Sequence, residues 1–569
     1  MEAARDLSVL APAPALAEPS PPSAAARRFA AELKLTTTIA EWLLRRGHHD
    51  VESARRFLDP KLNQLSSPQG MADRSLAASR LAAAIRGGER ICVFGDYDCD
   101  GMTAAAIMTE ALRALGGTVD VHLASRFDGG YGVSPAAVER IAATGARLLV
   151  TCDCGSSDHV SLRELGRRGI ECIVIDHHLV PDEPLPALAF LNPHRPDCGF
   201  AYKGMASCGL ALSVAGAVRT ELGRELDLKQ WLDLVAIGTI ADVAPLDGDN
   251  RPLVRAGLRL LGEARRPGLR ALLEQARWDF SLPLGAEDVS YRIAPRLNAP
   301  GRLGPADLAL RIMLERSPER AYALALEAEE LSQQRRAVQD RMLAEAEEEI
   351  EAQGYASRSA LVLGREGWNH GIVGIVAGRL ASKYERPVIV AGFENGHGRG
   401  SVRGPKGSRL YDMLAQSSAA LVRFGGHQAA AGVELRATEL ASLRELFEHA
   451  AQSAPAPLSS GEGDQLLWVV PDDELFRVQA DLELLEPCGA ENPAPAVALR
   501  ARVVSAREVT GGHLKLELEL GRGQRLGAFG PLLGHRAGEL GTEVAVSGRL
   551  RRDAYRGGNA IELKLERFL

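Results

Sequence analysis

The feature that most constrains this chain is a regular alternation of strand-length and helix-length segments from residue 75 to residue 175. Apolar runs such as Ile-Cys-Val-Phe at 91–94 are typical of buried strands, and segments with helical periodicity separate them. The predicted strands cover 91–94, 118–123, 147–151 and 172–175, and the predicted helices cover 75–86, 102–115 and 134–144. Strands that alternate with helices predict a parallel sheet with helices on both faces, and therefore an α/β fold.

Acidic residues follow three of these predicted strands. Gly-Asp-Tyr-Asp-Cys-Asp-Gly begins at residue 95, Cys-Asp-Cys-Gly at residue 152 and Asp-His-His at residue 176. Ligands bind at the carboxyl ends of the strands in an open α/β sheet, so we expect these side chains to meet at one edge. A further acid follows a helical run near residue 240 and could fold back over that edge. The candidate metal-binding residues are Asp96, Asp98, Asp100, Asp153, Asp176, His177, His178 and Asp242.

The chemistry of this set points to divalent cations. Several carboxylates brought together repel one another and cannot all stay ionised without positive charge. Oxygen ligands with imidazoles suit Mn²⁺ or Mg²⁺ better than Zn²⁺, which prefers thiolates. Two such ions can share a carboxylate and clamp both oxygens of a phosphoryl displacement. The sequence therefore predicts a two-metal phosphoesterase.

Each cluster taken singly has a simpler explanation. An aspartate-rich turn is most often a solvated loop or a calcium-binding turn, and an isolated Asp-His-His is usually a capped turn. The coincidence of three clusters at three successive strand ends favours a functional site over a structural one.

The rest of the chain divides by composition and pattern. Residues 1–28 are rich in Ala and Pro and are expected to be disordered, and an unbroken helix of roughly 35 residues is predicted to end at Gly354. The predicted divisions are a helical segment 29–74, a catalytic α/β domain 75–245, a helical connector 246–354, a second α/β domain 355–452, a linker 453–464 and an all-β domain 465–569.

Composition narrows the class of protein. The net charge of −7 argues against general coating of nucleic acid but leaves room for a local basic surface. Eight scattered cysteines form neither a disulfide framework nor a zinc ribbon, which favours a reducing cytoplasm. No apolar run is long enough to span a membrane, and the N-terminus lacks a secretory signal pattern, so no membrane association is expected.

Several motifs resemble those of the DHH phosphoesterase superfamily: GDYDCDG, TCDCG, IDHH and GTIADVAPL, in this order. Within it, the chain is similar to the RecJ family of bacterial exonucleases, over roughly residues 35–569. Further similar segments lie at 125–132, 295–302, 368–374, 424–432 and 485–493. The resemblance implies a DHH domain with a parallel sheet, a long connecting helix, a second α/β DHH-associated domain and a C-terminal all-β OB-fold.

The resemblance also implies roles for the metal-site residues, with Asp98, Asp100, Asp153 and His178 as the catalytic residues. Asp98 and Asp100 would each bind one metal ion, and Asp153 would bridge the two. His177 and Asp242 would complete the second metal's shell. His178 would contact a metal or the scissile phosphate, and Asp96 and Asp176 would ligate or orient.

A second set of residues is implied to hold the 5′-phosphate and the flanking backbone of a single strand. Arginine suits this task because its planar fork matches phosphate oxygens. For any single arginine, a surface salt bridge is an equally good explanation. The substrate-binding candidates are Arg126, Tyr131, Arg296, Arg302, Ser401, Arg403 and His427.

Two segments depart from the family pattern. The phosphate-binding loop has Val402 and Gly404 where glycine and serine are usual, while Ser401 and Arg403 keep their places. The late motif has Cys488 and Glu491 in place of an aromatic and a small residue, in a region expected to form a hinge.

The last domain is locally basic. Residues 497–569 contain 13 Lys and Arg against 8 Asp and Glu. An OB-type barrel with basic and aromatic residues is a common platform for single strands, although a solvated hairpin in a structural barrel would give the same pattern. The residues that suggest the platform are Arg549, Arg551, Arg552, Tyr555 and Arg556.

The leading hypothesis is a 5′→3′ exonuclease specific for single-stranded DNA that releases nucleoside 5′-monophosphates with Mn²⁺ or Mg²⁺. It is expected to be a monomer, and the family implies repair and recombination beside a helicase and a single-strand binding protein. One alternative is a DHH phosphodiesterase of short oligoribonucleotides or cyclic dinucleotides, which would need neither the extra β domain nor the long helix. The other is a catalytically silent binding module, but every metal-binding side chain is present.

Overall fold

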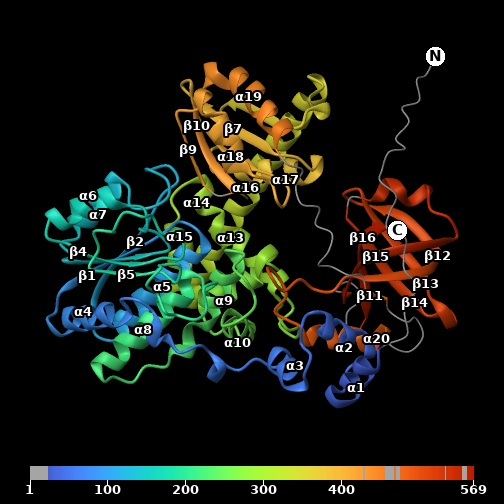
Figure 1. Ribbon diagram of the computed structural model, residues 1–569, viewed down its shortest axis with the longest axis horizontal. Coiled ribbons are helices and arrows are strands. Elements are labelled where there is room, and N and C mark those ends of the chain that lie inside the picture. The colour runs from blue at the N-terminus through green and yellow to red at the C-terminus, as the bar shows by residue number, and fades with distance from the viewer. Residues whose placement is uncertain are drawn as a thin grey trace. The chain divides into compact units, whose positions relative to one another are not determined.

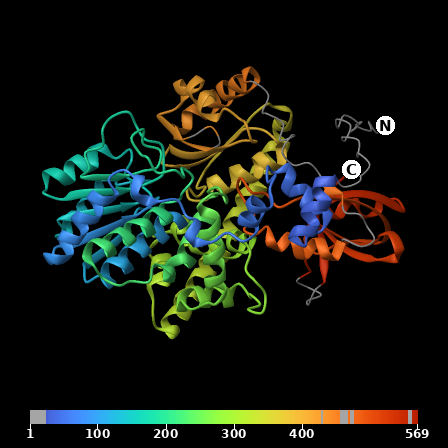
Figure 2. The ribbon, with the colours of Figure 1, turned by 60° about the horizontal axis from the view of Figure 1, so that its bottom comes forward.

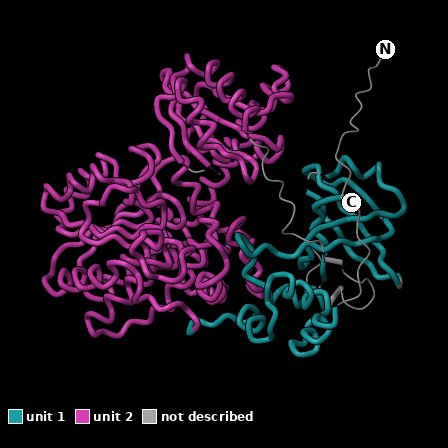
Figure 3. Tube along the Cα trace, viewed as in Figure 1, with its two compact units in different colours: residues 1–63, 462–569 teal, residues 64–461 magenta. Residues whose placement is uncertain are grey.

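A computed structural model describes residues 23–426, 428, 430–454, 467–468, 475–531, 533–553 and 560–569. The chain forms two compact units (Figure 3): residues 64–461 make one, and residues 1–63 together with 462–569 make the other. In the described part of the chain, no helix combines the length and the apolar character needed to cross a bilayer.

The larger unit begins with a five-stranded parallel sheet in the order β2-β1-β3-β4-β5 (Figure 1). Its strands are β1 (Arg90–Gly95), β2 (Thr118–Leu123), β3 (Leu148–Cys152), β4 (Glu171–Ile175) and β5 (Ala189–Leu191). Its helices are α4 (Arg74–Arg86), α5 (Cys99–Ala114), α6 (Pro135–Ala143), α7 (His159–Arg167), α8 (Ser207–Leu222) and α9 (Leu232–Ala241). The predicted strands and the parallel sheet are confirmed, and the short strand β5 is an addition.

Alternating side chains of this sheet build two cores. Cys92, Phe94, Leu149 and Val174 pack with residues of α6 and α7 in one buried cluster. The helices α5, α8 and α4 lie on the other face, so helices cover both faces, as Figures 1 and 2 show. A strand buried on both faces reads as a continuous apolar run, which is the reason these strands were predictable.

Helices connect this sheet to a second one. They are α10 (Asn250–Gly262), α11 (Pro267–Gln275), α12 (Ala286–Asp288), α13 (Ala294–Asn298), α14 (Pro300–Leu303), α15 (Asp307–Leu314) and α16 (Pro318–Ala352), with a π-helix at Val289–Ile293. The side chain of Ser317 caps α16 by accepting a hydrogen bond from the Arg320 amide. Pro318 follows at the first helical position, where its missing N–H is not needed. The 35-residue α16 confirms the predicted long connecting helix.

The second sheet is mixed, in the order β6-β7-β8-β10-β9. Its elements are β6 (Leu361–Glu366), α17 (Val373–Tyr384), β7 (Val388–Glu394), β8 (His397–Arg403), α18 (Leu410–Gln416), β9 (Arg423–Gly426), β10 (Ala430–Arg436) and α19 (Leu440–Ser453). Only β6 and β7 are parallel; the other neighbours pair antiparallel. Helix α17 packs with α16 on one face, and α18 and α19 cover the other.

The smaller unit combines segments from both ends of the sequence. Its elements are α1 (Ala24–Leu33), α2 (Thr37–Arg45), α3 (Val51–Leu58), β11 (Leu467–Trp468), α20 (Leu475–Leu484), β12 (Val497–Val509), β13 (His513–Glu519), β14 (Arg525–Gly530), β15 (Glu543–Arg552) and β16 (Ile561–Phe568). Strand β12 pairs with both β13 and β15, which closes β12–β16 into a barrel. The barrel is the predicted OB-type domain, but the predicted all-β range 465–569 also contains the helix α20.

Helices α1–α3 share one apolar core with α20 and the barrel. Phe29 and Ile39 belong to the same buried cluster as Val478 and Leu516. The backbone amide and the hydroxyl of Thr36 both donate to the buried Asp481 carboxylate, at 2.6 and 2.7 Å. The sequence predicted the helical segment 29–74 and the domain 465–569 as separate parts, whereas they share this core. It also placed residues 24–28 in the tail, whereas α1 begins at Ala24; residues 1–22 lie outside the described part.

Candidate active site

The first acidic cluster forms the turn from β1 into α5. The Asp98 carboxylate accepts a hydrogen bond from the Gly101 amide at 3.0 Å and so caps α5, and Asp100 lies in its first turn. Gly101 is required here, because a Cβ atom would lie 2.6 Å from the backbone nitrogen of Asp96. The close turn directs Asp96, Asp98 and Asp100 to the carboxyl end of the sheet.

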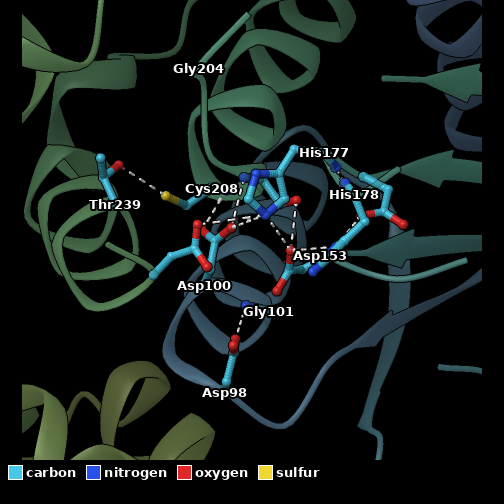
Figure 4. Close-up of polar contacts among 12 residues, drawn as sticks. Asp98, Asp100, Gly101, Asp153, His177, His178, Gly204, Cys208 and Thr239 are labelled. Carbon is cyan, nitrogen blue, oxygen red and sulfur yellow. Dashed lines mark hydrogen bonds and ion pairs between the residues drawn. The ribbon is translucent and has the colours of Figure 1, made fainter. Parts of the chain in front are cut away.

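The other strand ends bring imidazoles to these acids (Figure 4). The Nε2 atom of His177 lies 3.3 Å from Asp153 Oδ1, 3.9 Å from Asp100 Oδ2 and 3.6 Å from Asp242 Oδ2. Asp153 follows β3 with φ of 65°, a left-handed conformation that is uncommon outside glycine and recurs at functional sites. Asp242 lies at the end of α9, as expected from the sequence.

Three overlapping groups could each hold a metal ion: Asp153 with His177 and His178, Asp100 with His177 and Asp242, and Asp96 with Asp98 and Asp153. Within each group the ligand atoms lie within 4.8 Å of one another. Seven of the eight predicted residues take part, and Asp153 and His177 each belong to two groups. Shared membership is the property expected of a carboxylate that bridges two ions.

Asp176, the eighth predicted residue, is used differently. Its carboxylate accepts hydrogen bonds from the backbone amides of Ser156, His177 and His178, and its Oδ1 lies 2.8 Å from His178 Nδ1. Burial disfavours its charged form, but His178 outweighs this and lowers its pKa to about 2. The geometry favours orientation of the histidine loop over metal ligation.

His178 is held from two sides. Burial lowers its pKa, but the hydrogen bond and charge of Asp176 dominate and raise the pKa to about 9. The hydroxyl of Tyr131 lies 3.0 Å from His178 Nδ1 and donates to the carbonyl oxygen of Asp153 at 3.1 Å. Tyr131, a predicted substrate-binding residue, thus also supports the metal-site loop.

The electrostatics of the site fit divalent cations. Burial, followed by the charges of neighbouring carboxylates, raises the pKa of Asp96 and Asp153 and raises that of Asp242 to about 8. Among the described residues, Asp96 Oδ1 and His177 Nε2 are buried with no hydrogen-bond partner. Oxygen and nitrogen atoms that lack partners, and carboxylates that resist ionisation together, are what Mn²⁺ or Mg²⁺ would satisfy.

The metal-free protein should lose thermal stability as the pH rises from about 5 to 9. A raised carboxyl pKa means that the folded state keeps protons which the unfolded chain has released. The stabilisation is therefore complete below the ordinary pKa of 3.8 and is lost as the pH rises through about 8, the folded value for Asp242. Melting temperatures in chelator at pH 6, 7, 8 and 9 would test this. An Asp242→Asn variant should show a weaker dependence; a melting temperature that rises with pH would contradict the prediction.

Helix α8 supplies support that the sequence did not reveal. The amides of Ser207 and Cys208 donate to the two carboxylate oxygens of Asp100, at 2.7 and 2.9 Å. The Ser207 hydroxyl donates to Asp153 Oδ1 at 3.0 Å. The amino end of α8 thus fixes two acids of the site, and the positive end of the helix dipole favours their charged forms.

Asn192, after β5, is another positioning residue that the sequence did not indicate. Its side-chain amide donates to the carbonyl oxygen of His178 at 2.8 Å, and its side-chain oxygen accepts a hydrogen bond from the His194 amide at 2.8 Å. No motif pointed to Asn192, because its role depends on contacts made after folding.

Gly238 allows α9 to approach the site. A Cβ atom there would lie 2.8 Å from Asp100 Oδ1 and 2.7 Å from Cys208 Sγ, and closer still to Thr103. Gly238→Ala is therefore expected to displace Asp100 and to weaken Mn²⁺ binding by roughly 10-fold or more, as outer-shell changes do. Gly262→Ala is a suitable control because nothing lies within 4 Å of its added Cβ. Titration calorimetry that gave equal affinities for the two variants would contradict the prediction.

A cluster of arginines without acidic partners lies in the same unit. Among the described residues, no carboxylate forms an ion pair with Arg126, Arg302, Arg335 or Arg403. Burial, and then the charges of Arg126, Arg335 and Arg403, lower the pKa of Arg302 to about 9. Arg126 lies over the ring of Tyr97, and its Nε is buried with no hydrogen-bond partner. Uncompensated guanidinium groups of this kind are suited to bind an anion.

Some of the predicted substrate-binding residues have no carboxylate partner and could contact an anion, whereas at least one is already paired with an acid. Ser401 and Arg403 lie against Gly374 at the start of α17, where an added Cβ would be 3.1 Å from Ser401 Oγ and 3.4 Å from Arg403 Nη2. Arg296 instead pairs with Glu329 at 2.5 Å and donates to a carbonyl oxygen, which are structural contacts. Arg335, which the sequence did not indicate, belongs to the unpaired cluster. His427 lies outside the described residues.

Three regions match known domain families: the DHH family, N-terminal domain (residues 90–239), the DHHA1 domain (357–453) and the RecJ OB domain (471–567). The fold and the acidic site thus define a protein of the DHH class. The single-stranded-DNA-specific exonuclease RecJ of Dickeya dadantii is 34% identical over 95% of this chain and 98% of its own length. This chain belongs to the RecJ family.

Another relative and a solved structure support the same family and fold. RecJ of Bacillus subtilis is 34% identical over 86% of this chain, but the chain spans only 62% of that protein. The crystal structure of RecJ in complex with Mn²⁺ from Thermus thermophilus superposes with a TM-score of 0.81 and 32% identity, over 96% of this chain and 78% of that one. The predicted family and fold class are confirmed.

Proposed function

We propose that this chain is a single-stranded-DNA-specific 5′→3′ exonuclease that hydrolyses phosphodiester bonds with two divalent ions, Mn²⁺ or Mg²⁺. The observation that carries the proposal is the set of overlapping ligand groups at the edge of the first sheet, with Asp153 in two of them. The relatives support it, because those with about 34% identity are single-stranded-DNA-specific exonucleases. The Thermus thermophilus structures contain Mn²⁺ or Mg²⁺.

The metal-site residues have separate roles in this proposal. Asp153 would be shared by the two ions, Asp98 would hold one and Asp100 the other, and His177 and Asp242 would complete the ligands of the second ion. With both ions bound, the site has the Lewis acidity that attack of water on a phosphodiester requires. The Asp176 carboxylate would hold His178 in position to contact a metal ion or the scissile phosphate.

The arginine cluster is proposed to hold the 5′-terminal phosphate. Four guanidinium groups without carboxylates can be neutralised by a terminal phosphate and the backbone next to it. Attachment of the strand by its end would explain a 5′→3′ direction of degradation. In this proposal Arg335 replaces Arg296 among the residues that contact the phosphate.

Arg335→Gln is expected to reduce the preference for 5′-phosphorylated over 5′-hydroxyl single strands by roughly 10-fold, since a hydrogen bond to a charged group contributes about 1.5–3 kcal/mol. Release of mononucleotides from the two end-labelled strands measures the preference. Arg336→Gln is the matched control on the same helix, because Arg336 is exposed and has Glu329 within 4.0 Å. An unchanged preference in Arg335→Gln would contradict the assignment.

The proposal for the barrel is more modest than its composition suggested. Arg549 pairs with Glu566 at 2.9 Å, Arg551 with Glu562 at 2.7 Å and Arg552 with Glu483 at 2.6 Å. Tyr555 and Arg556 lie outside the described residues. We propose that the barrel contributes contacts to a single strand, although Arg549, Arg551 and Arg552 are already paired with acids.

The biological setting is proposed from the family alone: repair and recombination in the cytoplasm, as a monomer, beside a helicase and a single-strand binding protein. The domain boundaries expected from the sequence are part of the same proposal. A test of the whole function uses 5′-phosphorylated single-stranded DNA, the matching duplex and a dinucleotide. Mononucleotides from the single strand alone would support it; hydrolysis of the dinucleotide alone would favour a small-substrate phosphodiesterase.

A further inference from the structure

A buried cluster of charged side chains lies in the larger unit, apart from the acids of the metal site. Its centre is Arg266, whose side chain is 5% exposed, and its acids are Glu110 and Asp233, 10% and 6% exposed. None of these residues belongs to a motif, and the proposed reaction uses none of them. Three buried charges without a catalytic task require an explanation, because burying ions is costly.

Arg266 joins several helices at one point. Its Nη1 atom lies 2.9 Å from Glu110 Oε1 on α5 and donates to the carbonyl oxygen of Met313 on α15 at 2.8 Å. Its Nε atom lies 3.4 Å from Asp233 Oδ2 at the start of α9. Glu110 is further fixed by Trp231, whose indole nitrogen donates to it at 2.7 Å, and by Arg316.

The two acids occupy the far ends of the helices that carry metal-site acids. On α5, Asp100 lies in the first turn and Glu110 follows ten residues later; α9 has Asp233 in its first turn and Asp242 at its end. Ten residues of helix span about 15 Å. Helix α5 therefore leads away from the site and α9 leads back to it, and Arg266 connects them where they are farthest from the metals.

Apart from the Cys208 thiol of α8, which lies 3.5 Å from the Val235 carbonyl oxygen and from the Thr239 hydroxyl, few polar contacts fix the register of α9. Nine of the ten residues of α9 are buried, and apart from Asp233 and Thr239 they are apolar, so no polar stripe fixes its position. A shift by one residue would move Asp242 by about 1.5 Å, whereas metal–ligand distances are held to about 0.2 Å. Such a shift would also carry Gly238 away from Asp100, where only glycine fits.

We propose that Arg266 is a positioning residue: by holding Glu110 and Asp233 together it sets the register of α9 on α5, and so the spacing of Asp100 and Asp242 across the metal site. The inference rests on the proposed function, since it requires those two acids to share a metal ion. A buried ion cluster seldom adds stability over an apolar one of the same shape, but it can specify one arrangement.

The test measures Mn²⁺ binding to the full chain by titration calorimetry, together with the melting temperature. Arg266→Met is expected to weaken Mn²⁺ binding by roughly 10–100-fold, the range found for residues that support metal ligands. The control is Arg444→Met, which removes another partly buried arginine of the same unit, paired with Glu349 and bonded to the Val362 carbonyl. The control should keep the Mn²⁺ affinity of the parent even where its melting temperature falls.

A triple variant separates positioning from stability. Arg266→Met with Glu110→Met and Asp233→Leu removes all three central charges and should recover melting temperature without recovering Mn²⁺ affinity. If either folded variant, single or triple, binds Mn²⁺ as tightly as the parent, the inference is overturned. If the parent itself binds no Mn²⁺, the proposed function fails and the inference falls with it, which is a distinct result.

Discussion

Replacement of Asp153 by asparagine is expected to lower the rate of mononucleotide release by more than about 100-fold while leaving the fold intact. Changes to residues that only support metal ligands typically cost 10–100-fold, and Asp153 is proposed as a ligand of both ions. Asp153 Oδ1 also lies 3.3 Å from His177 Nε2 and accepts a hydrogen bond from the Ser207 hydroxyl. One substitution thus removes the charge that both proposed metal ions would share.

Asparagine is preferable to alanine for this test. Asp153 has φ of 65°, which asparagine tolerates better than alanine does, so Asp153→Asn removes the charge without an added backbone cost. Asp120→Asn serves as a control, because Asp120 is a surface residue of the same sheet, paired with Arg90 at 2.7 Å. Full activity of Asp153→Asn under single-turnover conditions would refute the assignment of the site.

Removal of divalent ions is expected to have a comparably large effect. Metal ions contribute several kcal/mol of transition-state stabilisation, so dialysis against chelator should reduce mononucleotide release by at least about 10³-fold, and Mn²⁺ or Mg²⁺ should restore it. Binding of a 5′-phosphorylated strand should survive, because the arginine cluster holds the phosphate without the metals. Fluorescence anisotropy and product release, measured on the same samples, separate binding from hydrolysis.

The number of ions gives a further check. Calorimetric titration of the parent chain should reveal two Mn²⁺ sites, and Asp153→Asn should lose at least one of them. Activity that persists in exhaustively chelated protein would exclude the two-metal proposal. If the parent chain binds only one Mn²⁺ ion, the enzyme can still be metal-dependent, but Asp153 cannot bridge two ions.

The metal-site acids were predictable because their positions follow from local patterns. An apolar run marks each strand, and the parallel topology brings the carboxyl ends of all strands to one edge. Asp96, Asp153 and His177 therefore needed no knowledge of distant contacts. The residues that hold these acids in place could not be predicted in this way. Ser207 and Asp153 are 54 residues apart, and the sequence before α8 carries no sign of their hydrogen bond.

The arginines show the same limit of prediction from sequence, because whether a cation finds a carboxylate partner depends on contacts between distant residues. Arg296 lies in the family-similar segment 295–302, whereas no motif marks Arg335. In the structure, Arg296 pairs with Glu329, 33 residues away, and among the described residues no carboxylate pairs with Arg335. Likewise, the apolar faces of α1–α3 predicted helices but not that the barrel covers them, since an apolar stripe does not specify its partner.

The shared core of α1–α3 and the barrel has a consequence for synthesis on the ribosome. Thr36 and its buried partner Asp481 are 445 residues apart, so translation at 5–20 residues per second separates them by roughly 20 to 90 seconds. During that interval the first helices leave the ribosome with those parts of their apolar faces exposed that α20 and the barrel later cover. Their protection from aggregation must come from elsewhere until the last strand is made, which gives chaperones a defined window in which to act on this chain.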